Sequence, residues 1–220
     1  MAPTSSAEFV AAMEDVLEVY ARPVDARRPL VCLDECTKQL TREVRPVQPA
    51  RPGRAAREDY EYERNGVAAI FCVVAPHLGW RAVEERERKT RCDYAEVLRK
   101  LCDESFPEAE RIVLVQDNLN THSPASLYEA FPPAEAARIK ARFEFHFTPK
   151  HGSWLNIAEI ELSVLARSCL RQRIPDRPTL ARHLAAYQLL RNQSCKKIRW
   201  QFSSADARKK LIKLYPSIYS

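Results

Sequence analysis

Hydrophobic and polar positions follow two periods along the chain, one typical of helices and one typical of strands. Residues 7–22 carry apolar side chains at helical spacing, and Pro23 and Pro29 end this element. Residues 67–80 instead form a nearly continuous apolar run closed by Pro and Gly, which predicts a buried strand. The same reasoning predicts strands at residues 29–40, 81–89, 111–117 and 143–149, and helical segments at 90–106, 125–143, 154–173 and 179–193.

The order of these elements predicts the fold class. Three strands that can pair antiparallel come first, and helices alternate with strands after them, which favours parallel pairing. We therefore expect an α/β fold with a mixed five-stranded sheet flanked by helices. Residues 42–57 interrupt the pattern with three prolines and a glycine, so we predict a long loop there.

Composition indicates the class of protein and its cellular compartment. The chain has 220 residues, of which 45% are hydrophobic, enough for one sizeable domain. No apolar run reaches the length of a membrane span, and the N-terminus lacks a signal peptide pattern. The seven cysteines include no C-x-x-C pair, so we expect buried, reduced thiols rather than a zinc site. These features predict a soluble cytoplasmic protein with no membrane partner.

Positive charge is concentrated in two regions. The net charge is +6, yet residues 167–213 hold thirteen Lys or Arg against two acids, so the rest of the chain sums to −5. Residues 37–57 hold six basic residues and one acid. A basic C-terminal third beside a mildly acidic body suggests a polyanionic partner, although a solvated helical face would have the same composition.

Acidic residues stand where chemistry is possible. Asp34 lies within the first predicted strand, where aspartate is disfavoured, and Asp117 ends a later buried strand. Glu159 and Glu161 lie near the start of the helix after the last strand. If the first and fourth strands are neighbours, Asp34 and Asp117 share a site that a helix carboxylate completes. Such a site suits Mg²⁺, which prefers oxygen ligands, and two such ions support phosphoryl transfer.

Each acid also has a structural interpretation. Asp117 followed by Asn118 is typical of a turn, and Glu159 stands three residues after Asn156, as in a helix capping box. Helix geometry does not choose between Glu159 and Glu161, because both lie about 80° from the centre of the apolar face, on opposite sides.

Three segments together carry a family resemblance: VCLDE (31–35), VLVQDNLNTH (113–122) and HFTPKHGSWLNIAEIE (146–161). They resemble the DDE catalytic domain of transposases, in the bacterial insertion-sequence branch of the mariner-like superfamily called the IS-six-thirty family. The resemblance covers about residues 7–215. It implies an RNase H-like DDE domain at residues 29–175, an N-terminal helix and linker remnant at 1–28, and a basic C-terminal helical extension at 176–220.

The resemblance also implies residue roles. Asp34, Asp117 and Glu159 match the catalytic, metal-binding acids, and the family motif selects Glu159 over Glu161. Asn118 and His122 match supporting positions, and for His122 structural support is preferred to proton transfer. The implied cofactor is two Mg²⁺ ions, for which Mn²⁺ can substitute. The implied partner is double-stranded DNA, both element ends and target, whose phosphates basic loop residues would contact: Arg42, Arg45, Arg51, Arg54 and Arg57.

Two features depart from the family pattern. Forty-one residues separate Asp117 from Glu159, slightly more than in the tightest mariner-like members. Only one predicted helix precedes the first catalytic strand, where family members usually carry a helix-turn-helix region. We therefore expect an upstream-encoded helix-turn-helix half and a homodimer as partners, at the bacterial nucleoid. The alternatives are a catalytically idle DNA-binding fragment or regulator, and a structure-specific RNase H-like nuclease.

Overall fold

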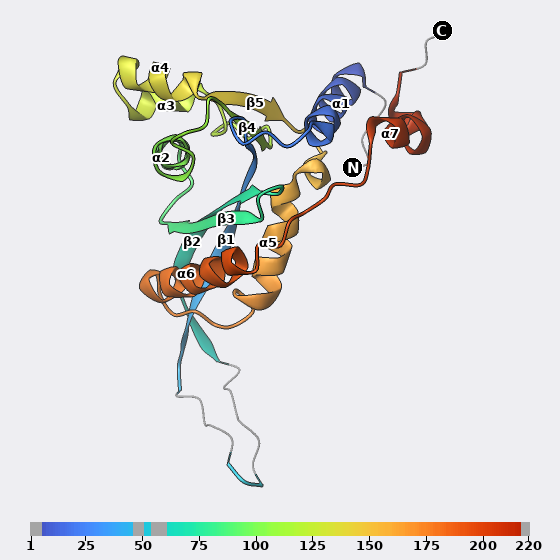
Figure 1. Ribbon diagram of the computed structural model, residues 1–220. Coiled ribbons are helices and arrows are strands. Elements are labelled where there is room, and N and C mark those ends of the chain that lie inside the picture. Colours follow the sequence, from blue (N-terminus) through green and yellow to red (C-terminus); the bar gives the residue numbers. More distant parts are fainter. Residues whose placement is uncertain (1–5, 46–50, 54–60, 217–220) are drawn as a thin grey trace.

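The computed structural model describes residues 6–45, 51–53 and 61–216, in which helices surround a central sheet (Figure 1). The strands are β1 (Leu30–Glu43), β2 (Tyr62–Ala75), β3 (Trp80–Arg86), β4 (Ile112–Gln116) and β5 (Phe143–Phe147). The helices are α1 (Ala7–Ala21), α2 (Arg91–Lys100), α3 (Ala125–Ala130), α4 (Pro133–Ala141), α5 (Ile157–Ser168), α6 (Arg177–Gln193) and α7 (Ser204–Lys210). A π-helical turn, Leu101–Ser105, extends α2, and 3₁₀ turns occupy Ser153–Leu155 and Ile212–Leu214.

The strands form one mixed sheet in the order β3-β2-β1-β4-β5. β2 pairs antiparallel with β1 and with β3, whereas β1, β4 and β5 run parallel. β1 is central because both of its faces are apolar at its start, with Cys32 in the core on one side and Leu33 in the core on the other. The predicted mixed five-stranded sheet is confirmed, and so is the adjacency of the first and fourth strands.

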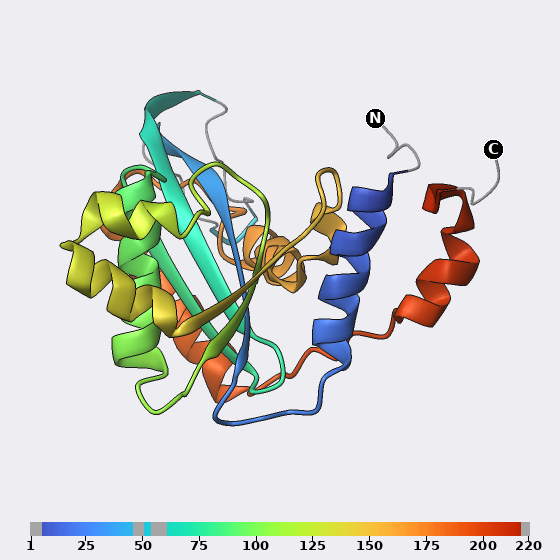
Figure 2. The same cartoon turned by 90° about the horizontal axis from the view of Figure 1, so that it is seen from above.

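Helices cover the two faces of the sheet as separate layers (Figure 2). Side chains of α2, α3 and α4 form the core on one face, and those of α1, α5 and α6 form it on the other, with Ala207 of α7. Elements from the predicted flanking segments 1–28 and 176–220 thus share a core with β1. In the described part of the chain, no helix is both long and apolar enough to cross a membrane.

β1 and β2 extend beyond the body as a long hairpin (Figure 1). Their pairing continues to Glu43 and Tyr62, with an irregularity after Gln39. The prediction of a loop from residue 42 onward is therefore wrong at its start, because pairing with β2 satisfies the backbone of Arg42. Arg45 and Arg51 follow the strand, whereas Arg54 and Arg57 lie outside the described residues.

A buried cluster of charges fastens α6 to the sheet and to α5. Glu161 of α5 is fully buried. Its Oε2 lies 3.0 Å from Nε of Arg81 in β3, and its Oε1 lies 2.7 Å from Nε of Arg191 in α6. Tyr187 donates a hydrogen bond to the same carboxylate at 2.5 Å. Burial alone would raise the pKa of Glu161, but the hydrogen bonds from Arg191, Tyr187 and Arg81 lower it. Glu161 is therefore occupied in joining three elements.

We expect Glu161→Ala to lower the free energy of unfolding by about 3–5 kcal/mol, because it leaves the buried Arg81 charge without its carboxylate partner. Urea unfolding followed by circular dichroism measures this change. The control is Glu129→Ala, which removes an exposed partner of Arg91 and should cost about 1 kcal/mol or less. Equal costs for the two variants would contradict the structural role of Glu161.

Candidate active site

Asp34 and Asp117 are brought together by the parallel register of β1 and β4. Cys32 pairs with Val115, and the same offset two residues further along places Asp34 beside Asp117. Adjacent strands lie about 4.8 Å apart, and a step of two residues returns side chains to the same face. That face is the one covered by α5, since Cys32 and Val115 belong to its core.

Glu159 approaches the same place from the first turn of α5. The N-cap residue, Asn156, is fully buried, and its Nδ2 donates to the carbonyl of Leu33 at 2.8 Å. Its Oδ1 accepts a hydrogen bond from the N–H of Ala158 at 3.1 Å. Asn156 thus ties the start of α5 to the residue before Asp34. Glu159 is half-buried and forms no capping box with Asn156, so the capping interpretation is wrong.

The charges of Asp117 and Glu159 act on Asp34. The pKa of Asp34 is raised to about 7: burial is the largest cause, a hydrogen bond from the Glu35 N–H opposes it, and the nearby charges of Asp117, Glu35 and Glu159 add to the rise. Asp34 is only 9% exposed. It makes no ion pair with any described residue, so the local excess of negative charge favours a cation.

Asp117 differs from Asp34 because a histidine holds it. Nδ1 of His122 lies 2.5 Å from Oδ1 of Asp117, and the N–H of Leu119 donates to the same oxygen at 3.2 Å. Burial alone would raise the pKa of Asp117, but its contacts with His122 lower it. The predicted turn at Asp117 is therefore present, and Asp117 also lies beside Asp34 in the candidate site. Asn118 is exposed and lines a cavity of about 440 Å³ between α1 and the loop after β5.

His122 is enclosed by residues from three elements. The ring centroid of Tyr94 lies 4.9 Å from that of the imidazole, and Nε2 of Gln116 donates a hydrogen bond to the His122 carbonyl at 3.1 Å. Nε2 lies 2.9 Å from Oε2 of Glu35, an ion pair whose geometry falls short of a hydrogen bond. Burial lowers the pKa of His122, but contacts with Asp117 and Glu35 raise it to about 9. The ring therefore carries a positive charge at neutral pH.

The donor chemistry of Asp34, Asp117 and Glu159 fits a divalent ion. All three offer carboxylate oxygens, which Mg²⁺ and Mn²⁺ prefer. No three His, Cys, Asp or Glu side chains in the described ranges already converge as a metal cage. Mg²⁺ does not require one, because it is usually held by one or two carboxylates together with waters and substrate phosphates.

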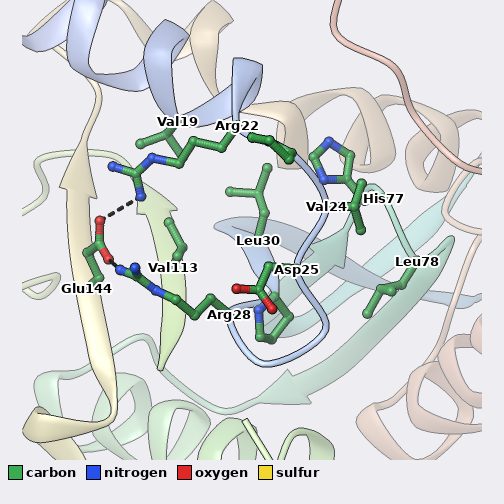
Figure 3. Close-up of a pocket in the computed structure, with 12 residues that line it drawn as sticks. Val19, Arg22, Val24, Asp25, Arg28, Leu30, His77, Leu78, Val113 and Glu144 are labelled. Atoms are coloured by element: carbon green, nitrogen blue, oxygen red, sulfur yellow. Dashed lines mark hydrogen bonds and ion pairs between the residues drawn. The ribbon is translucent and has the colours of Figure 1, made fainter. Parts of the chain in front are cut away.

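A separate cavity of about 380 Å³ lies at the opposite end of the parallel strands (Figure 3). Leu30 and Val113, at the amino ends of β1 and β4, form part of its lining. Arg22 and Arg28 point toward Glu144 there and pair with it. Ligands of open α/β sheets bind at the carboxyl ends of the strands, so the acids rather than this cavity mark the candidate site.

The residues around the site fall within a known family. The family model described as DDE superfamily endonuclease matches residues 29–181, a range that contains Asp34, Asp117 and Glu159. The chain belongs to the DDE superfamily endonucleases. No curated protein matches the sequence of this DDE domain.

Solved structures share the fold of the DDE domain. The Mos1 strand transfer complex is similar at 14% identity and a TM-score of 0.51, over 86% of this chain and 60% of that chain. The mariner Mos1 paired end complex with Mg is similar at 13% identity and a TM-score of 0.52, over 95% and 61%. The predicted RNase H-like fold is thereby confirmed. The chain spans about three fifths of the length of these Mos1 chains.

Two residues of the site were not predicted in these roles. Asn156 entered the sequence analysis only as a capping candidate, because its bond to Leu33 joins residues 123 positions apart. Glu35 was not singled out, although strand alternation indicates that it faces away from Asp34. The available signal was an acid on the second buried face of a central strand, where a charge is costly.

We expect Asp34→Asn to stabilise the metal-free protein at alkaline pH. The pKa of Asp34 rises from 3.8 to about 7 on folding, so the folded state binds this proton more tightly than the unfolded chain. Ionisation therefore destabilises the fold as pH rises through this window, by at most about 4 kcal/mol.

The measurement is urea unfolding of both proteins in EDTA at about pH 4 and pH 8. The gain from Asp34→Asn should be absent at the lower pH and present at the higher one. A gain that is the same at both pH values would show that ionisation of Asp34 carries no cost.

Proposed function

We propose that this DDE domain is the catalytic part of a transposase, which cuts DNA at the ends of an insertion sequence and joins them to target DNA. The observation that carries the proposal is the convergence of Asp34, Asp117 and Glu159 at one edge of the sheet, in a chain of this family. Phosphoryl transfer demands positioning and charge neutralisation more than covalent chemistry from the protein. We assign the chain more narrowly to the IS-six-thirty branch on its sequence motifs.

In the proposed mechanism, Asp34 and Asp117 would hold one divalent ion, and Asp117 or Glu159 would help to hold a second. When bound, two Mg²⁺ or Mn²⁺ ions supply an activated water and stabilise the attacking and leaving oxygens. Water attacks a phosphodiester at the element end and breaks its bond to the 3′-oxygen, which frees a 3′-hydroxyl. That hydroxyl then attacks a phosphodiester of the target DNA, and the 3′-oxygen of the target strand leaves as the new bond forms. No covalent protein intermediate is needed. His122 keeps Asp117 ionised and oriented, and Asn118 supports the turn.

We expect Asp117→Ala and Glu159→Ala each to slow Mg²⁺-dependent cleavage of element-end DNA at least about a hundredfold, since metal-ion catalysis is worth several kcal/mol. DNA binding, measured by mobility shift, should stay within about twofold. Glu129→Ala, on the exposed surface of α3, is the control for cleavage. A wild-type cleavage rate in Asp117→Ala would refute the assignment.

The same assay separates the alternatives. Faster cleavage of RNA–DNA hybrids or junctions than of element ends would favour a structure-specific nuclease. DNA binding without cleavage by the wild-type chain would favour an idle fragment or regulator.

We propose that the arginines at the far end of the β1–β2 hairpin bind DNA phosphates. Such phosphate contacts position DNA without reading its sequence. Arg42, Arg45 and Arg51 are exposed on or beyond the end of β1, and Arg54 and Arg57 follow in the sequence. Replacing the first three by alanine should weaken DNA binding and reduce the slope of log K against log salt by up to about 3, roughly 0.9 for each phosphate that the protein no longer neutralises. Binding measured by fluorescence anisotropy between about 50 and 200 mM salt tests this.

The matched control for that measurement is Arg138→Ala. Arg138 lies on α4 and already pairs with Asp103 and Glu135, so its replacement should leave the slope unchanged. An unchanged slope in the triple hairpin variant would place the DNA elsewhere on the molecule.

We also propose that the working assembly includes a helix-turn-helix half encoded upstream, and a second copy of the chain that pairs two element ends. Sequencing the DNA on either side of the reading frame tests the first part. An upstream frame encoding a helix-turn-helix, bracketed with this one by inverted repeats, is expected. Flanks with neither would point to a stranded or repurposed domain.

A further inference from the structure

We propose that Glu35 is a positioning residue of the active site, which orients His122 from the buried side of the sheet and so fixes the carboxylate of Asp117 for metal binding. The inference rests on the proposed function. It adds a residue that touches neither metal nor DNA.

Strand alternation separates Asp34 from Glu35. Asp34 follows the parity of Cys32 and faces α5, whereas Glu35 follows the parity of Leu33 and faces the layer that contains α2. The side chains of these two consecutive acids of β1 thus lie on opposite faces of the sheet. Glu35 can reach the site only through residues on its own face of the sheet, and His122 lies there, with its ring packed at a tilt against Tyr94 of α2.

The surroundings of Glu35 give its carboxylate few partners. Its side chain is 3% exposed, and neither oxygen has a hydrogen-bond partner among the described residues. Its ion-pair contacts are Nε2 of His122 at 2.9 Å and Nζ of Lys89 at 3.9 Å. A buried carboxylate without hydrogen bonds costs folding free energy. A buried charge that lacks hydrogen bonds, and so breaks the usual rule of polar satisfaction, is typical of a functional position.

The imidazole transmits this placement to Asp117. His122 has an exposed fraction of 0% at its side chain and meets Glu35 through Nε2 and Asp117 through Nδ1, so its ring cannot turn without breaking one of these two interactions. Asp117 is 34% exposed at its side chain, so a ligand can reach it. Residues that orient a metal ligand in this way typically change metal affinity 10- to 100-fold when removed.

The test measures Mn²⁺ binding by the decrease of the free-ion signal in electron paramagnetic resonance, with the full chain and a duplex of about four helical turns, roughly 40 base pairs. Glu35→Gln keeps the shape of the side chain and removes its charge. We expect it to weaken Mn²⁺ binding by about 10- to 100-fold, with DNA affinity within about twofold. Glu35→Asp, which keeps the charge but withdraws it from His122, should weaken binding too and serves if Glu35→Gln does not fold.

The matched control is Glu161→Gln, at another buried glutamate, which pairs with arginines rather than with His122. It should lower the melting temperature and leave Mn²⁺ affinity unchanged. A double-mutant cycle adds a second readout: Glu35→Gln combined with His122→Gln should be no weaker than His122→Gln alone, because Glu35 acts through that ring.

The outcomes separate this inference from the proposed function. If the wild-type chain does not bind Mn²⁺, or if Asp117→Asn binds it as well as wild type, the metal site itself is refuted. If Asp117→Asn does not bind Mn²⁺ and Glu35→Gln binds it like wild type, only the role of Glu35 is overturned. Additive effects in the double variant would also overturn it, because Glu35 would then act without His122.

Discussion

The parallel register of β1 against β4 is the constraint on which the rest of the site depends. A slip of one residue would send the side chain of Asp34 to the face opposite Asp117 and would also turn every core residue of the strand to the wrong side. Both faces of β1 are apolar before Asp34, with Cys32 and Leu33 in separate cores. The hydrophobic packing that stabilises the sheet therefore also sets the position of the two acids.

Different environments give the two neighbouring aspartates different proton affinities. Burial and nearby negative charge raise the pKa of Asp34, whereas contacts with His122 outweigh burial and lower the pKa of Asp117. Two carboxylates in one place avoid mutual repulsion when one of them holds a proton. The metal-free fold can thus tolerate its own site near neutral pH, and a divalent cation would replace the proton as the source of compensation.

Sequence patterns predicted the features that depend on local order and missed those that depend on distant partners. The strands, their mixed pairing and the approach of Asp34 to Asp117 follow from periodicity and element order. Glu159 and Glu161 were equivalent on the helix, because the interaction that distinguishes them comes from Arg81, 80 residues away. The extension of β1 into a proline-containing segment escaped prediction for the same reason, since the partner strand supplies its hydrogen bonds.

The central place of Asp34 in the sheet has a consequence for dynamics. Asp34 is paired with Cys72 of β2 and follows directly after the part of β1 that also pairs with β4, whereas Asp117 lies in a turn after β4. Local opening of a turn requires much less free energy than opening a central strand. The backbone around Asp34 should therefore open more rarely than the turn that carries Asp117. Ligand binding would then restrict backbone motion in the turn that carries Asp117 and leave the backbone at Asp34 unchanged.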